Sequence, residues 1–178
     1  MQLDQDLLSQ LSLRAVSLED LEALETKTYL STFDADDAFQ LGTFIRDTVR
    51  ELYPEKAVSI DITLPNGHCL FRSVSRNGTA FDNDMWIKRK QTTVFRFGHS
   101  SFYMGCKKGD TPAIERFFVD EKEYAFHGGA VPILSSAVGY PIACLTVSGL
   151  RQHEDHLLAL TCLDAYAKNS TLEKLELD

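Results

Sequence analysis

The sequence contains no long hydrophobic run, and its first residues lack the features of a targeting signal. No stretch approaches the ~18–20 apolar residues that a membrane-spanning helix needs, so we expect no direct membrane insertion. Residues 1–16 carry acidic side chains early and have no basic segment followed by an apolar core, which argues against a signal peptide and a mitochondrial transit peptide. These absences predict a cytoplasmic protein.

Short motifs of catalysis and metal binding are also missing. The chain has no Cys-x-x-Cys, no Gly-x-Ser-x-Gly, no P-loop and no Gly-x-Gly-x-x-Gly. His153 and His156 lack the His-Glu-x-x-His spacing and a third ligand, so we expect no metal site. A non-enzymatic protein is therefore favoured, although a Cys–His pair for nucleophilic catalysis stays open because the chain holds 4 cysteines and 5 histidines.

Cysteine is scarce, and the four cysteines lie far apart in the sequence. Scattered cysteines with mostly apolar neighbours do not form the dense disulfide framework of small secreted domains. We expect free, buried thiols in a reducing compartment at Cys69, Cys106, Cys144 and Cys162.

Positive charge is outweighed by negative charge. The chain has 18 Lys and Arg against 26 Asp and Glu, which gives a net charge of −8. A strongly acidic balance disfavours nucleic acid and anionic membranes as partners. The length of 178 residues suits one domain with its own core.

The hydrophobic periodicity predicts helices and strands in alternation, without an internal repeat or a domain linker. A loop is expected at residues 107–112, and a strand or an ordered loop at 117–126. Helices are expected at 17–24, 34–52, 79–97, 100–106 and 152–167; strands are expected at 27–33, 57–64, 68–75, 131–134 and 141–147.

The order of these elements predicts the fold class. Val58, Ile60 and Ile62 alternate with polar residues, which is typical of a half-exposed strand, and the following Asn66-Gly67 predicts a hairpin turn. The whole set suits a single α/β domain with a central antiparallel sheet flanked by helices. We divide the chain into an N-terminal arm or short helix at 1–16, the domain at 17–167 and a C-terminal tail at 168–178.

Several motifs along the chain resemble one known family. They are Asn83, Trp86 and Arg89-Lys90; Ser100-Ser101 and Met104; His127-Gly128-Gly129; Pro132-Ile133; Leu145 to Leu150; and Asp155-His156. Together they resemble the GlcG/HbpS family, often described as the haem-degrading domain family, and more closely its UPF0303 branch. The resemblance runs from about Leu18 to Tyr166. It implies a profilin-like fold and a homo-oligomer, with haem as a candidate ligand, but no settled activity.

Residues 85–108 hold six basic side chains and no acid. Aromatic residues interleave with them, so a pocket with an aromatic wall and a cationic rim would suit a flat anionic ligand such as haem. A solvated basic helix face, a face paired across an oligomer interface and a single-stranded nucleic-acid site are the alternatives; the acidic balance disfavours the last. The candidate ligand-binding residues are Trp86, Lys88, Arg89, Arg96, His99 and His127.

The two histidines in this set admit a structural interpretation as well. His99 is suited to haem ligation or to acid–base work, because imidazole titrates near neutral pH. The structural alternatives are that it caps a helix or lies in the core with its hydrogen bonds satisfied. His127 precedes Gly128-Gly129, which permits close approach of a ligand or simply forms a turn.

The last four residues are the candidate partner-binding tail. Leu175, Glu176, Leu177 and Asp178 resemble the Glu-Glu-Val-Asp tails of the Hsp70 and Hsp90 chaperones, which a TPR clamp holds. Leu177 stands in place of Val, and Leu175 departs from the pattern. As the last residue, Asp178 offers two carboxylates to a basic clamp. The alternative is the frayed end of the last helix.

These observations lead to one main functional prediction and one alternative. The main one is a non-catalytic, cytosolic homo-oligomer that docks TPR-containing co-chaperones through its tail, with a link to the delivery of membrane-protein clients. The alternative is a haem-binding or haem-degrading protein that uses the basic region; no cofactor is required by any motif. We expect the oligomer interface around Trp86 and Phe102.

Overall fold

The computed structural model describes residues 1–177, with the side chains of residues 170–177 outside what it describes. Its centre is a five-stranded sheet in the order β1-β4-β5-β2-β3. The pairs β4–β5, β5–β2 and β2–β3 are antiparallel, and β1 is parallel to β4. The strands are β1 (Tyr29–Leu30), β2 (Ser59–Thr63), β3 (Cys69–Val74), β4 (Ala130–Ser135) and β5 (Ala143–Ser148). The antiparallel-centred α/β domain predicted from sequence is confirmed.

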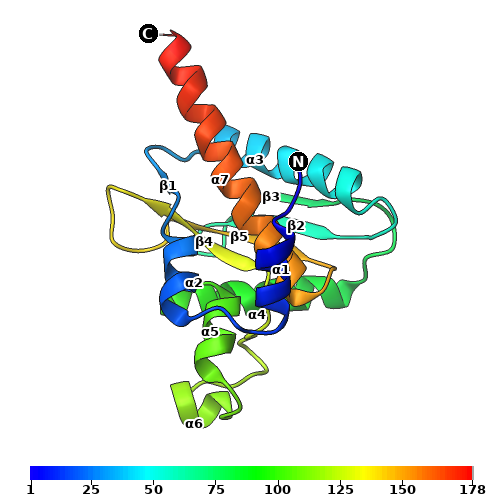
Figure 1. Cartoon of the computed structure of the whole chain (residues 1–178), viewed down its shortest axis with the longest axis vertical. Coiled ribbons are helices and arrows are strands. Elements are labelled where there is room, and N and C mark those ends of the chain that lie inside the picture. Colours follow the sequence, from blue (N-terminus) through cyan, green and yellow to red (C-terminus); the bar gives the residue numbers. More distant parts are fainter. Residues whose placement is uncertain (178) are drawn as a thin grey trace.

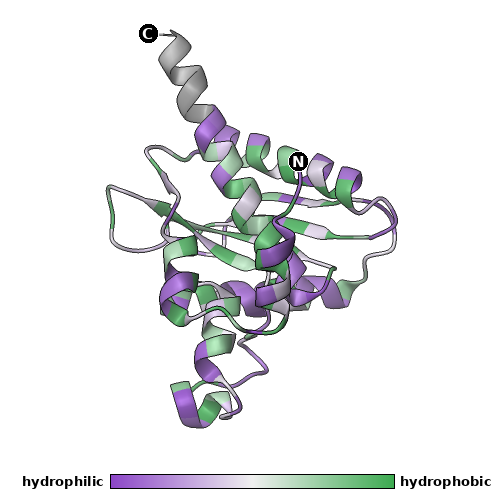
Figure 2. Cartoon of the chain, viewed as in Figure 1, coloured by the Kyte–Doolittle hydropathy of each residue, from purple (hydrophilic) through white to green (hydrophobic). Residues whose placement is uncertain are grey.

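Helices cover both faces of the sheet (Figure 1). Helices α3 and α7 pack on one face, and α4 packs on the other. Because each covering helix buries one side, hydrophobic and hydrophilic stretches alternate along the helices in Figure 2. The helices are α1 (Gln5–Ser12), α2 (Leu18–Glu25), α3 (Ala35–Leu52), α4 (Phe81–Phe97), α5 (Ser101–Lys108), α6 (Ala113–Phe117) and α7 (Gln152–Leu177).

The two faces of the sheet differ in chemistry. Ile60 and Ile62 of β2, with Leu145 and Val147 of β5, lie fully buried in the main apolar core, which also contains residues of α3 and α7. The side chains between them in sequence are polar, and they lie under α4. The sheet therefore has one apolar face and one polar face, both covered.

This arrangement corrects the prediction of a half-exposed β2. Ser59, Asp61 and Thr63 are buried, because α4 covers the face of β2 that the alternating pattern predicts to be exposed to solvent. Asp61 is fully buried and accepts hydrogen bonds from Arg72 Nε at 2.7 Å, from Thr63 Oγ1 at 2.6 Å and from Gln91 of α4. A buried carboxylate is tolerated only when it is paired and hydrogen-bonded in this way.

The first strand and the last helix differ from the prediction, whereas the N-terminal arm and the segment before β4 follow one of the alternatives left open. The strand expected at 27–33 is reduced to β1. Residues 118–126 form a loop, one of the two alternatives predicted for this segment, after the unpredicted short helix α6, which ends at Phe117. The N-terminal arm forms α1, which packs against α7 and buries Leu11. Helix α7 continues past residue 167 through Leu177, because Leu, Glu and Lys in this stretch are strong helix formers.

Local capping explains where the predicted helices begin. Asp34 accepts hydrogen bonds from the backbone N–H groups of Asp36 and Asp37, and the Asp37 side chain accepts one from the Asp34 N–H. Ser17 accepts a hydrogen bond from the Asp20 N–H at 3.1 Å, so α2 begins directly after the residue where the sequence predicts a helix start. None of the helices in the described part of the chain combines the length and hydrophobicity that a membrane crossing needs.

Candidate functional site

A cleft of about 270 Å³ opens where α4 meets the start of α7 and the loop before β4. We call it the motif cleft. Its lining residues are Asn83, Trp86, Lys90, His127, Ser148, Gly149, Leu150, Gln152 and Asp155. All of them except Gln152 belong to the motifs that carry the resemblance described above. Segments far apart in sequence therefore converge on one cavity.

The floor of the motif cleft is a buried ion pair. Lys90 Nζ lies 3.6 Å from Asp155 Oδ2, and the two side chains are only 5% and 3% exposed. Lys90 Nζ also lies 3.4 Å from Ser148 Oγ. Asp155 accepts hydrogen bonds from the N–H groups of Leu150 at 3.0 Å and Gly149 at 3.4 Å, so the turn between β5 and α7 positions its carboxylate.

Burial perturbs both partners of this pair. It raises the pKa of Asp155 to about 6, although the Lys90 ammonium and the two backbone N–H groups act in the opposite direction. Burial likewise lowers the pKa of Lys90, against the effect of Asp155. Burial thus draws the pKa values of the Asp155 carboxyl group and the Lys90 amine towards each other. Ionisable groups with perturbed pKa values are common at ligand sites.

Gly129 allows the loop before β4 to pass close to this floor. Its φ of 123° lies in a region that side chains rarely adopt. A Cβ atom here would clash with the Val147 carbonyl and would lie 2.9 Å from Lys90 Nζ. The glycine pair is thus required by the approach of this loop to β5 and α4.

The rim of the motif cleft is aromatic and cationic. The Trp86 and His127 rings meet edge to face with centroids 4.9 Å apart, and the Arg89 guanidinium lies 4.6 Å from the Trp86 centroid. Trp86 Nε1 donates a hydrogen bond to Asp82 Oδ2 at 3.1 Å. Partial burial, then the positive charges of Lys90, Arg89 and Arg14, lower the pKa of His127. His127 is therefore a neutral ring at neutral pH.

Comparison with known proteins decides the family. A family model described as "Haem degrading protein HbpS-like" matches residues 33–164. The chain belongs to the HbpS-like family. It is 61% identical to the UPF0303 protein YBR137W of Saccharomyces cerevisiae over 176 residues, covering 99% of this chain and 98% of that protein. It is 37% identical to the UPF0303 protein SCO2848 of Streptomyces coelicolor over 155 residues, covering 85% and 94%.

Solved structures agree with this assignment. The crystal structure of the Ybr137w protein matches with a TM-score of 0.94 at 61% identity, over 96% of this chain and 98% of that one. The crystal structure of HbpS matches with a TM-score of 0.58 at 14% identity, over 78% and 92%. The second likeness concerns the fold alone, and it places this chain among HbpS-like folds.

The structure brings together only part of the predicted ligand-binding set of this HbpS-like chain. Trp86 and His127 line the motif cleft, and Arg89 lies against the Trp86 ring beside it. Lys88 is exposed and lines none of the cavities described here. Arg96 is exposed near the other end of α4, with its guanidinium 5.7 Å from the Phe97 ring.

His99 lies away from the cleft in a structural role. Its Nδ1 is 3.2 Å from a carboxylate oxygen of Glu25, which is buried and also accepts a hydrogen bond from the Ser100 N–H at 3.1 Å. The His99 ring stacks on Tyr103 with centroids 4.1 Å apart. The geometry favours the structural interpretation of His99, although the adjacent helix caps are Gly98 and Ser100 and not His99 itself.

Several residues of the cleft were missed. Asp155, Ser148 and Gln152 were not predicted as site residues, and Lys90 was noted in the basic run and in a family-like motif but not among the candidate ligand-binding residues. The usable signal was the resemblance itself, since Asn83, Lys90 and Asp155 all stand in its motifs.

The expectations for the cysteines, the interface and the tail have mixed outcomes. All four cysteines are free, but Cys69 is exposed and Cys106 half-buried. Phe102 is buried, so it does not form an exposed interface with Trp86. No group of side chains in residues 1–169 is suited to a metal ion. The side chains of Leu175, Glu176 and Leu177, and Asp178 as a whole, lie outside the described residues.

Proposed function

We propose that this protein is a non-catalytic binding protein whose motif cleft takes a flat, anionic small molecule. The observation that carries the proposal is the convergence of the family-like motifs on this one cleft, at Asn83, Trp86, Lys90, His127 and Asp155. Ligand sites are usually cavities with an apolar wall and a few convergent polar groups, and this cleft has both.

The lining chemistry supports this class of ligand. The Trp86 indole offers an aromatic wall on which a flat ring can stack. Arg89 supplies positive charge beside the Trp86 ring, and Lys90 offers an ammonium group at the floor, where Asp155 balances its charge. His127 offers an imidazole that donates or accepts a hydrogen bond beside the indole.

Trp86 makes the proposal testable because it is the only tryptophan of the chain. We expect saturable changes in its fluorescence on titration with adenosine monophosphate, a flat ring compound with one anionic group. His127→Ala should weaken this response, and the exposed control Lys88→Ala should leave it unchanged. No response of Trp86, together with no heat of binding in calorimetry, would refute the proposal.

Haem is the family-derived candidate for this cleft. The family description names haem degradation, and His127 and Arg89 would suit an axial ligand and a propionate partner. However, about 270 Å³ falls below the ~300–1,000 Å³ of pockets that enclose drug-sized ligands. The cleft of one chain therefore does not fit an enclosed macrocycle. A haemin titration checks this: a Soret shift abolished by His127→Ala would show that haem binds here with the help of another surface.

We also propose that the chain forms a homo-oligomer through the start of α4. Phe81 is 77% exposed and Met85 is 44% exposed, next to the half-buried Trp86. Large apolar side chains gathered on one exposed surface are typical of an interface. Sedimentation should show a species larger than 20.0 kDa, and Phe81→Glu should dissociate it. Phe118→Glu, at an equally exposed position elsewhere, is the control.

The second candidate function is docking of a TPR co-chaperone by residues 175–178, with delivery of membrane-protein clients as its biological setting. The favouring observation is that the C-terminal end of α7 projects away from the sheet in Figure 1. The last turn would have to unwind to enter a clamp, and helix ends open at little cost in free energy.

Calorimetry with a purified TPR clamp domain tests this candidate. Deletion of residues 175–178 should abolish binding, and high salt should weaken it. One extra residue after Asp178 should also abolish binding, because the terminal carboxylate would move. Equal affinities of the intact and extended proteins would exclude the clamp.

A further inference from the structure

A second cavity, of about 280 Å³, adjoins the motif cleft. We call it the basic pocket. Its lining residues are Arg14, Arg89, Gly105, Lys108, Gly109, Asp110, Glu121, Tyr124, Ala125, Phe126 and His127. His127 lines both cavities, so it stands between them. A ligand in one cavity is therefore within reach of the other.

Two guanidinium groups in the basic pocket have no carboxylate partner within residues 1–169. Arg14 Nη1 donates to the Gly105 carbonyl at 3.5 Å, and Arg89 donates to the Glu121 carbonyl. These contacts with backbone oxygens position the guanidinium groups without neutralising their charge. Lys108 differs, since its Nζ lies 3.7 Å from a carboxylate oxygen of Glu121.

Arg14 occupies a position where glycine is the usual residue. It follows α1 at a φ of 52°, which is left-handed. The Arg14 N–H donates to the Leu11 carbonyl, and the Ala15 N–H donates to the Gln10 carbonyl. This pair of bonds is the Schellman motif, whose left-handed residue is generally glycine because a side chain is strained there.

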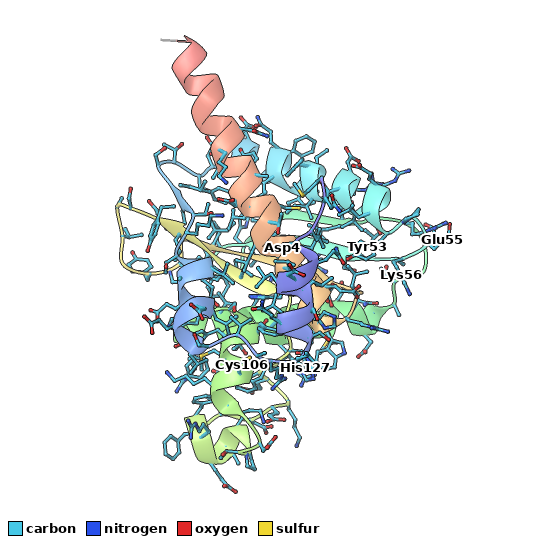
Figure 3. The ribbon with its side chains drawn as sticks, viewed as in Figure 1. Asp4, Tyr53, Glu55, Lys56, Cys106 and His127 are labelled. Carbon is cyan, nitrogen blue, oxygen red and sulfur yellow. The ribbon has the colours of Figure 1, made fainter. Side chains whose placement is uncertain are left out.

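The strain at Arg14 has a functional interpretation. Backbone strain of this kind clusters at functional sites, where the surrounding structure maintains it. Here α1 is anchored by buried Leu11, and Figure 3 shows His127 near the end of α1 from which Arg14 follows. Arginine in place of glycine brings a guanidinium group to the basic pocket. No other contact described for this residue requires an arginine here.

We infer that the basic pocket is a subsite for the phosphate group of a ligand whose ring lies in the motif cleft. The inference rests on the proposed function and names its ligand class. A phosphate monoester carries about −1.5 to −2 charges at pH 7, which matches the two unpaired guanidinium groups of Arg14 and Arg89. The planar fork of arginine also fits phosphate geometry.

The electrostatics around His127 agree with this assignment. Besides burial, Lys90, Arg89 and Arg14 lower its pKa, and Glu121 alone acts in the opposite direction. A phosphate beside these cations would offset their field and raise the pKa of His127. Binding should then be accompanied by proton uptake near neutral pH, which calorimetry in buffers of different ionisation enthalpy detects.

Calorimetry with a matched pair of compounds tests the subsite. Adenosine monophosphate and adenosine share the ring and differ in the phosphate. We expect adenosine monophosphate to bind the purified full-length protein ~10- to 100-fold more tightly, the range for charge-assisted hydrogen bonds. Inorganic phosphate should compete with adenosine monophosphate but not with adenosine.

Arg14→Gly is the decisive variant, since it removes the guanidinium group and relieves the left-handed strain. We expect it to reduce the advantage of adenosine monophosphate over adenosine, since only Arg89 remains, while unfolding at the same or a higher temperature than the original chain. Lys88→Gly would break a helix, so Lys88→Gln serves as the control for the loss of one positive charge. It should leave both affinities unchanged.

The outcomes separate the two proposals. If adenosine binds as tightly as adenosine monophosphate, or if Lys88→Gln acts as strongly as Arg14→Gly, the phosphate subsite is wrong; the motif cleft then remains a site for a flat ring, without the preference for an anion. If neither compound binds and Trp86 fluorescence does not change, the proposed function fails as well.

Discussion

Replacement of Lys90 by Met should destabilise the protein strongly at neutral pH. The Lys90–Asp155 pair is almost completely buried, so Lys90→Met would leave an unpaired carboxylate in the interior. Breaking a buried pair from one side costs about 3–5 kcal/mol. We expect a loss of this size in the free energy of unfolding, measured by urea denaturation at pH 7.

The pH dependence of this loss follows from Asp155. Its pKa in the folded protein is already raised to about 6 from 3.8, and loss of the Lys90 charge should raise it further. The folded variant then binds a proton more tightly than the unfolded chain. The resulting stabilisation is complete at low pH and is lost as the pH rises through the pKa of the folded state. The penalty of Lys90→Met should accordingly be smaller at pH 5 than at pH 7.

Two controls make the reasoning refutable. In the exposed pair Lys27–Asp164 the charges are closer, at 3.1 Å, but the side chains are 56% and 22% exposed. Lys27→Met should cost less than about 1 kcal/mol, because solvent screens such pairs. The double variant Lys90→Met/Asp155→Leu should recover much of the lost stability. If Lys90→Met costs no more than Lys27→Met, or if its penalty increases at pH 5, the buried-pair account is wrong.

Three further predictions concern buried groups. His156 is fully buried, and its ring nitrogens have no hydrogen-bond partner among residues 1–169. His156→Phe should leave the free energy of unfolding unchanged or increase it by ~1–3 kcal/mol. Burial lowers the pKa of His156 to about 3, so the original protein loses stability as the pH falls below ~6.5. Urea denaturation should therefore show less acid sensitivity in the variant. Gly129→Ala should lower the melting temperature, because its Cβ would clash with the Val147 carbonyl; an unchanged melting temperature would contradict the turn geometry. Cys144 and Cys162 should resist a thiol reagent until the protein is denatured, since burial raises the pKa of both to about 12; modification in the native state would refute their burial.

The sheet and the main helices could be predicted because their signals are local. The period-2 alternation of β2, the Asn66-Gly67 turn and the caps at Ser17 and Asp34 each depend on residues close in sequence. The alternation of apolar and polar residues in β2 does not reveal whether water or another part of the protein covers the polar face. Asp61 looked exposed because a polar side chain in a strand faces either water or a polar partner, and here the partner is Gln91 of α4.

The site was harder to predict because its parts are distant in sequence. Arg14, Lys90, His127 and Asp155 come together only through the packing of α1, α4 and α7 around the sheet. Sequence spacing carries no information about such contacts. The basic run pointed to α4, yet it did not separate Arg89, which lines the basic pocket and contacts the Trp86 ring, from Lys88, which is exposed.

The polar face of the sheet has a consequence for local opening. Helix α4 is bound to β2 and β5 largely through buried polar groups such as Asp61, Gln91 and Lys90, whereas α3 and α7 are held by a large apolar core. Polar contacts can be replaced by water at a smaller loss of free energy than apolar burial, so α4 should detach at a lower free energy than global unfolding. Amide hydrogens of α4 would then exchange before those of α7 residues 152–167. The motif cleft is lined by residues of both helices, so a bound molecule would hold α4 against α7. It would then slow the exchange of the α4 amide hydrogens by stabilising the layer of the domain that detaches most easily.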